Sequence, residues 1–125
     1  MLVSFLGPHD YISPSWYVTP NVPTWNYQAA HLYGTATLIE DNEAVKSIVN
    51  ALTDKYEAGF TNPWQADYHE GMLNAIIGLE IKLTDIQCTF KLSQNKTDKD
   101  KNSAIQALED RGSMQLANAM RKQLT

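Results

Sequence analysis

Residues 22–39 read VPTWNYQAAHLYGTATLI, the longest stretch of strand-like composition in the chain. Trp25, Tyr27 and Tyr33 are interspersed with threonines and small apolar residues, and aromatic and β-branched residues are enriched in strands. A glycine inside such a stretch, here Gly34, marks a bulge or a bend. The pattern therefore predicts one long, bent strand around which the rest of the chain must be arranged.

A shorter strand is predicted before this stretch. Residues 2–6 form an apolar run that stops at Gly7-Pro8, a pair that favours a turn. Residues 9–21 contain two prolines and several aromatic side chains, so we expect a loop there. Within that loop, Ser13 is expected to cap a single helical turn.

Strand patterns return near the middle of the chain. Residues 79–84 place apolar side chains on one face and polar side chains on the other, which is the alternation of a half-exposed strand. Residues 85–89 interrupt the pattern, and residues 90–93 form a second short run. We therefore expect an antiparallel hairpin, although its turn contains no glycine.

Apolar residues at helical spacing predict four helices, which cover residues 42–58, 69–76, 99–111 and 113–123. Asp41, Asp98 and Ser113 are the expected N-caps, and Gly112 is the expected left-handed exit of the third helix. The last two helices fit either an αα-hairpin lying on the sheet or a helix-turn-helix that reads DNA. The αα-hairpin is favoured, because the last helix carries few basic residues.

The composition predicts one α+β domain with a single core. The 125 residues are 43% hydrophobic and 19% charged, which argues against intrinsic disorder. Ten Lys and Arg residues against 14 Asp and Glu residues give a net charge of -4, which argues against a protein that coats nucleic acid. No apolar run approaches the roughly 18 residues that span a bilayer and no signal peptide is recognisable, so a cytoplasmic protein is expected.

Cys88 is the only cysteine, which excludes an internal disulfide and a four-cysteine zinc site within one chain. A reducing compartment is the simpler expectation. The thiol is expected to be buried and structural, because free cysteines are among the most buried residues. His9, His31 and His69 do not stand at metal-ligand spacing, so no metal site is predicted.

Three clusters concentrate polar and aromatic residues where a plain sheet does not need them. They are the first cluster (Gly7–Tyr17, GPHDYISPSWY), the second cluster (Val22–Tyr27, VPTWNY) and the third cluster (Lys91–Asn95, KLSQN). An anionic, planar ligand needs a cation and hydroxyl or amide donors for its phosphate, and aromatic walls for its ring. Together the three clusters supply these groups.

The three clusters resemble the signatures GPHxYISPxWY, VPTWNY and KLSQNR of the PaiB-like family, the FMN-binding negative transcriptional regulators of bacteria. The similarity runs in order over nearly the whole chain. It implies a split β-barrel of the flavin-reductase and pyridoxamine-phosphate-oxidase type with peripheral helices, a homodimer, and noncovalent FMN near the subunit interface. It also implies a regulatory role, and through it DNA as a partner, although the sequence shows no basic face.

The resemblance implies a set of cofactor-binding residues. We expect Lys91 to meet the phosphate, together with donors from Ser13, Gln94 and Asn95. The two tryptophans also suit a core or a dimer interface, and the third cluster also suits the closing of a hairpin, so these alternatives stay open. The complete expected set is Ser13, Trp16, Trp25, Asn26, Lys91, Ser93, Gln94 and Asn95.

The chain departs from the family pattern at three places. Family members usually begin with further strands, so residues 1–125 are expected to form one partial barrel that needs a second chain to cover Val3 and Phe5. Lys96 stands where arginine is usual, which keeps the charge but loses the bidentate fork. Gln87-Cys88-Thr89 replaces the usual Glu-Gly-Lys of the hairpin turn.

Two further functions stay open at this point. One is a flavin-dependent oxidoreductase of the same barrel class, in which the bound ring exchanges hydride with a nicotinamide or a small substrate. The sequence names no general acid or base for it. The other is a shortened homologue that folds and dimerises without binding FMN.

Overall fold

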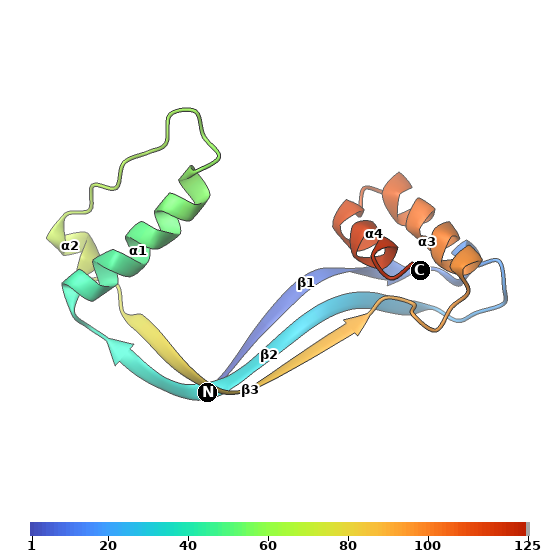
Figure 1. Cartoon of the computed structure of the whole chain (residues 1–125), viewed down its shortest axis with the longest axis horizontal. Coiled ribbons are helices and arrows are strands. Elements are labelled where there is room, and N and C mark those ends of the chain that lie inside the picture. Colours follow the sequence, from blue (N-terminus) through green and yellow to red (C-terminus); the bar gives the residue numbers. More distant parts are fainter. Residues whose placement is uncertain (125) are drawn as a thin grey trace. The chain divides into compact units, whose positions relative to one another are not determined.

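The structure is a computed structural model that describes residues 1–124, apart from the side chain of Glu70. The elements in chain order are β1 (Leu2–Ile12), η1 (Pro14–Trp16), β2 (Thr24–Ile39), α1 (Asn42–Glu57), α2 (Glu70–Leu73), β3 (Gly78–Lys91), α3 (Asp98–Asp110) and α4 (Met114–Arg121). The strands form one sheet in the order β1-β2-β3, with β1 and β2 antiparallel (Figure 1). The predicted α+β class is confirmed, and an open sheet of this kind is compatible with part of a split barrel.

The chain divides into two compact units, which are described separately. The α1 unit consists of Met1 and Gly34–Leu83, and the α3/α4 unit consists of Leu2–Tyr33 and the residues from Thr84 onward. Each unit therefore contains part of β2 and part of β3 together with its own helices.

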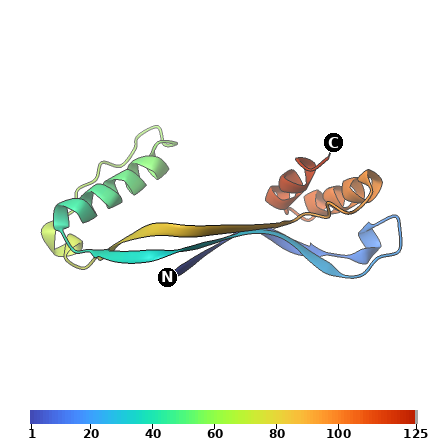
Figure 2. The ribbon, with the colours of Figure 1, turned by 60° about the horizontal axis from the view of Figure 1, so that its bottom comes forward.

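The α3/α4 unit contains the main hydrophobic core. In this unit α3 and α4 lie side by side, and α4 also contacts β1 (Figure 2). The buried apolar side chains of this core are Ile12, Tyr17, Leu92, Ala104, Ile105, Leu108, Leu116, Ala117 and Met120. Because both helices bury their apolar faces here, the favoured αα-hairpin is the arrangement that the structure has.

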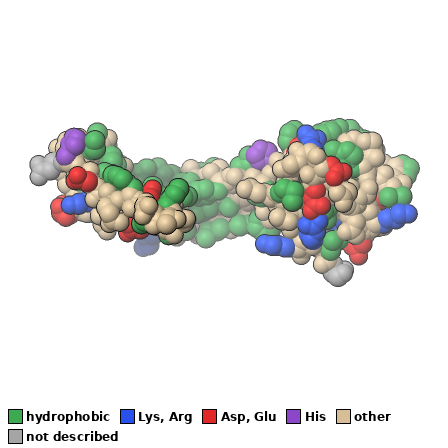
Figure 3. All heavy atoms as spheres, turned by 90° about the horizontal axis from the view of Figure 1, so that it is seen from above, with side chains coloured by type: hydrophobic (Ala, Val, Ile, Leu, Met, Phe, Trp, Pro, Cys, Tyr) green, Lys and Arg blue, Asp and Glu red, His purple; other side chains and the backbone are tan. Residues whose placement is uncertain are grey.

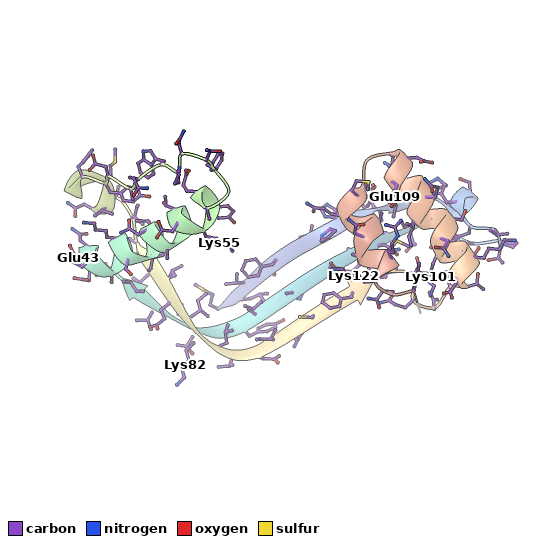
Figure 4. All side chains as sticks on the ribbon, turned by 45° about the horizontal axis from the view of Figure 1, so that its top comes forward. Glu43, Lys55, Lys82, Lys101, Glu109 and Lys122 are labelled. Carbon is purple, nitrogen blue, oxygen red and sulfur yellow. The ribbon has the colours of Figure 1, made fainter. Side chains whose placement is uncertain are left out.

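Ion pairs lie at both ends of α3, and the one at its C-terminal end joins it to α4. Figure 4 labels Lys101 and Glu109, one member of each pair. Lys101 pairs with Asp98 at 2.7 Å within the first turn of α3, and Arg121 of α4 pairs with Glu109 at 2.5 Å. Gly112 joins the helices with φ of +85°, which confirms the predicted left-handed exit.

The α1 unit is held by fewer buried side chains. Val45 and Leu73 are buried among its described residues. The loop after α1 folds back onto the helix, because the Tyr68 hydroxyl forms a 2.6 Å hydrogen bond with Thr53 and the Trp64 ring meets the Tyr68 ring edge to face. Asp41 caps α1 by accepting a hydrogen bond from Ala44 N–H, as predicted.

The prediction that β1 stops at Gly7-Pro8 is wrong, because the strand continues to Ile12. The register shifts between Leu6 and His9, so that two residues of β1 face one residue of β2. A β-bulge of this kind accommodates proline, since the extra residue needs no ladder hydrogen bond. The pair that reads as a turn is therefore a bulge within a longer strand.

The predicted hairpin at residues 79–93 is also wrong, because β3 runs without a break from Gly78 to Lys91. The long strand β2 offers a pairing partner along that length, and residues 85–89 lack the glycine or asparagine that a tight turn prefers. Cys88 is exposed rather than buried, because β3 lies at an edge of the sheet with most side chains uncovered.

Helix positions agree with the sequence more closely than strand positions. The predicted helix at 69–76 is shorter in the structure. After α2, the N–H groups of Ala75 and Ile76 donate to carbonyls three residues earlier, as in a turn, and not four residues earlier, as in an α-helix. Thr97, and not Asp98, is the N-cap of α3, since its hydroxyl accepts from Asp100 N–H. Among the described residues, no helix has both the length and the apolar character needed to cross a bilayer.

Candidate functional site

A tight turn follows β3 and contains the third cluster. The Gln94 side chain continues the strand pattern, because its Oε1 accepts from Leu92 N–H at 2.8 Å and its Nε2 donates to the Phe90 carbonyl at 2.6 Å. Ser93 adopts φ of 60°, in the left-handed region that serine rarely visits. The Lys96 N–H donates to the Ser93 carbonyl at 3.0 Å and closes the turn, with Lys91 before it and Lys96 at its end.

A buried polar network holds this turn in place. The Ser93 hydroxyl forms a 2.7 Å hydrogen bond with the Tyr17 hydroxyl and accepts from Asn26 Nδ2 at 2.9 Å. The other Nδ2 proton of Asn26 points at the Met120 sulfur, 3.4 Å away. Asn26 is only 1% exposed, and its Oδ1 has no hydrogen-bond partner among the described residues.

Next to this network lies a pocket of about 160 Å³, hereafter the lysine pocket. Its lining residues are Tyr17, Asn21, Val22, Thr24, Asn26, Lys91, Ser93, Gln94, Asn95 and Lys96. The Lys96 ammonium donates to Asn21 Oδ1 at 2.7 Å and lies 5.5 Å from the centre of the Tyr17 ring. The Lys91 ammonium donates to the Thr24 hydroxyl.

The charge of the lysine pocket opposes that of the whole chain. Two ammonium groups line it, and none of its lining residues carries a carboxylate, whereas the chain has a net charge of -4. Two cations that share a partly enclosed site attract anions strongly, and a phosphate monoester can satisfy both together with the amide donors of the turn. The arrangement is therefore suited to a phosphate group.

The pocket brings together five of the eight residues expected from the sequence: Asn26, Lys91, Ser93, Gln94 and Asn95. Ser13, Trp16 and Trp25 do not line it. Ser13 caps η1 by accepting from Ser15 N–H, and Trp16 packs against the core with the Arg111 guanidinium 5.5 Å from its ring. Trp25 is 54% exposed and meets the Tyr11 ring edge to face.

Sequence reasoning missed several lining residues, of which Lys96 matters most. It was noted only as a substitution for arginine, although it supplies the second cation of the pocket. Tyr17 and Thr24 lay inside the first and second clusters and could have been found there. Asn21 could not, because nothing in a loop sequence indicates that its side chain will hold a lysine 75 residues later.

A second hollow, of about 470 Å³, lies between the β1 bulge and the start of α4. It is more open and is lined by Gly7, Pro8, His9 and the first residues of α4. His9 Nδ1 lies 2.9 Å from the Gly7 carbonyl oxygen. No lysine, arginine or carboxylate lines this hollow, and no group of three or more metal-ligating side chains is found in the described part of the chain.

Comparison with known proteins places the chain in a family. Residues 1–85 match the model of a family described as "Putative FMN-binding domain". The chain belongs to this FMN-binding domain family. The match covers the first and second clusters, and it confirms the PaiB-like resemblance that those clusters predicted.

Relatives of this family member extend the similarity to the third cluster. The "Protease synthase and sporulation protein PAI 2" of Bacillus subtilis is 42% identical over 132 aligned positions, which cover 99% of this chain and 63% of that protein. Uncharacterised proteins of Emericella nidulans and Aspergillus fumigatus are 31% and 30% identical, each over 90% of this chain and 53% of their own length. The chain thus spans less than two thirds of these relatives.

Proposed function

We propose that this chain binds FMN noncovalently, with the phosphate of the cofactor in the lysine pocket. The observation that carries the proposal is that Lys91 and Lys96 line the same pocket, which no carboxylate lines. Membership of an FMN-binding domain family supports the same cofactor. Gln94 and Asn95 add amide donors, and Asn26 supports the turn through its hydrogen bond to the Ser93 hydroxyl.

The pocket holds only one end of the cofactor. Its volume of about 160 Å³ is smaller than the roughly 300–1,000 Å³ of sites that enclose a whole drug-sized ligand. The flavin ring therefore lies outside the pocket, against an aromatic surface. Trp25 is exposed, but it alternates with the pocket residues Thr24 and Asn26 along β2 and therefore faces the other side of the sheet. We propose that the aromatic contact comes from Trp25 of a second copy, and contacts from Ser13 and Trp16 remain part of the proposal.

A homodimer would cover the part of the flavin that lies outside the lysine pocket. Phe5 and Leu6 of β1 are 58% and 63% exposed, and Phe90 of β3 is 53% exposed, so apolar side chains are uncovered on both edge strands of the α3/α4 unit. Hydrophobic side chains are also exposed on the face of the molecule that Figure 3 shows. Exposed apolar surface on edge strands favours association with another chain. We propose that a second copy covers these residues and borders the flavin.

The regulatory role implied by the PaiB-like resemblance is retained as part of the proposal. Direct DNA contact by α4 is disfavoured, since Leu116 and Met120 are buried and Arg121 is paired with Glu109. We therefore propose that any regulatory role is exerted through the state of the flavin or through a partner, and not through DNA contact by α4.

Titration of the purified protein with FMN tests the proposal. We expect saturable binding, competition by inorganic phosphate, and affinity reduced by about tenfold or more in Lys91→Gln and in Lys96→Gln, because each loses a charge-assisted contact. Lys99→Gln is the matched control, as Lys99 is an exposed lysine on α3 outside the pocket.

Equal affinities of the wild type and both pocket variants would contradict this placement of the phosphate. Absence of FMN binding by the wild type would contradict the function itself. FMN-dependent consumption of NAD(P)H would assign the chain to the oxidoreductases instead.

A further inference from the structure

Asp100 connects α3 to the loop that forms one wall of the lysine pocket. Asp100 is 1% exposed, and its carboxylate accepts three hydrogen bonds from that loop. Oδ1 accepts from Val18 N–H at 2.7 Å and from Thr19 N–H at 3.1 Å, and Oδ2 accepts from the Thr19 hydroxyl at 2.7 Å. One buried side chain therefore fixes two consecutive residues of the loop.

The loop that Asp100 holds is part of the binding site. Tyr17 precedes the held residues, and Asn21 and Val22 follow them, and all three line the lysine pocket. Asn21 in turn accepts the hydrogen bond from Lys96. The position of the loop thus determines where the second ammonium group of the pocket points.

The loop has little else to define its conformation. Among the described residues, no backbone–backbone hydrogen bond outside the regular elements involves residues 18–23. Val18, Thr19 and Pro20 are exposed, so burial of their side chains does not fix them either. The hydrogen bonds to Asp100 are therefore the principal restraint on this segment.

The N-terminal cap and the ion pair of α3 are made by residues other than the Asp100 side chain. The N-cap of α3 is Thr97, whose hydroxyl accepts from the backbone N–H of Asp100. Asp98 supplies the ion pair of the first turn through its contact with Lys101. The three hydrogen bonds that join the buried carboxylate to residues outside α3 all go to the loop.

We propose that Asp100 is a positioning residue for the lysine pocket, which holds residues 18–22 so that Asn21 directs Lys96 toward a bound phosphate. This inference rests on the proposed FMN-binding function. A loop that is ordered before the ligand arrives does not have to be ordered by it, and preorganisation of this kind raises affinity.

Four proteins test the proposal: the wild type, Asp100→Ala, Thr19→Val and Asp98→Asn. Asp100→Ala removes all three hydrogen bonds, Thr19→Val removes only the hydroxyl contact, and Asp98→Asn is a matched control in the same helical turn whose side chain is 54% exposed. The measurements are dissociation constants for inorganic phosphate and FMN, and hydrogen exchange at the amides of Val18 and Thr19.

Phosphate and FMN should both bind about tenfold more weakly to Asp100→Ala, with faster exchange at the two amides and a smaller effect in Thr19→Val. The control should match the wild type. Should Asp100→Ala not fold, weaker binding by Thr19→Val would sustain the proposal and unchanged binding would overturn it.

Wild-type affinity in Asp100→Ala, despite faster exchange at the two amides, would show that the contact is merely structural and would overturn the inference alone. A wild type that binds neither phosphate nor FMN would overturn the proposed function together with this inference. The two failures are thus distinguishable.

Discussion

Ser93 is the sole non-glycine residue with positive φ in the described part of the chain. A serine in that region costs of order 1 kcal/mol or more, and such a conformation persists only where its surroundings impose it. The hydroxyls of Tyr17 and Ser93 and the amide of Asn26 provide that restraint, as does the hydrogen bond from Lys96 N–H to the Ser93 carbonyl. The strained residue thus lies at the centre of the candidate site.

Asp100 gives the α3/α4 unit a defined response to acid. The hydrogen bond from the Thr19 hydroxyl lowers the pKa of Asp100 below its ordinary value of 3.8, and the amides of Thr19 and Val18 and the Thr97 hydroxyl act in the same direction, while burial partly opposes them. A carboxyl group with a lowered pKa contributes stability above its unfolded pKa and loses it as pH falls through the folded pKa.

We therefore expect wild-type stability to fall below about pH 3.8, and Asp100→Asn to be less stable than the wild type at pH 7 but to lose less on acidification. Urea denaturation at several pH values between 7 and 2.5 measures this. An equal loss of unfolding free energy on acidification in the two proteins would contradict the assignment to Asp100.

At the residue scale, the sequence predicted the polar members of the site better than their partners. Lys91 and Asn26 stand inside conspicuous clusters, so composition alone drew attention to them. Asp100 lies in a charged stretch that is typical of a solvated loop or helix face, and its burial depends on contacts with Thr19 at the other end of the sequence. Long-range contacts of this kind leave no local pattern.

Among the elements, β2 and β3 approach closely at Gly34. A Cβ atom at this position would lie 2.5 Å from the Lys82 carbonyl oxygen and 2.7 Å from Ile81 Cγ2. Backbone atoms cannot move aside as a flexible side chain does. The glycine that suggested a bulge therefore serves close packing of two strands, while the bulge itself occurs in β1.

Gly34→Ala should lower the stability of the α1 unit by about 1–3 kcal/mol, because the two strands must separate to admit the methyl group. Gly59→Ala is the control, since a Cβ there would meet nothing within 4 Å. Chemical denaturation measures both effects. The explanation fails if the two alanine variants prove equally stable.

Strand boundaries were the weakest predictions for a physical reason. Residues 85–89 can form a turn or continue a strand, and the outcome depends on whether a partner strand lies beside them. The long strand β2 is that partner, and nothing within residues 85–89 indicates its presence. Helices are defined largely by bonds within themselves, so α1 and α3 could be predicted to within one residue at each end. The three-stranded order of the sheet was not accessible from local patterns.

On the scale of the whole molecule, exposed apolar side chains on strands are the feature that favours association with another chain. Leaving one large apolar side chain uncovered forfeits about 1.5–3 kcal/mol relative to full burial. Several such residues line the edge strands of the α3/α4 unit, among them Phe5, Leu6, Ile86 and Phe90.

We expect sedimentation to detect a dimer or a larger species at micromolar concentration, and Phe5→Asp to shift the protein toward monomer, because a buried unpaired charge at an interface is unfavourable. Asn102→Asp is the control, because it adds the same charge at an exposed position of α3 away from the edge strands and should leave the association unchanged. A wild-type protein that remains monomeric at this concentration would refute the association.

The two lysines of one pocket also carry a thermodynamic implication. A dissolved oxyanion that binds both ammonium groups of the folded pocket is linked to folding by mass action. The melting temperature should then depend on the choice of buffer salt, so that phosphate and chloride solutions of equal ionic strength would assign different stabilities to the same polypeptide.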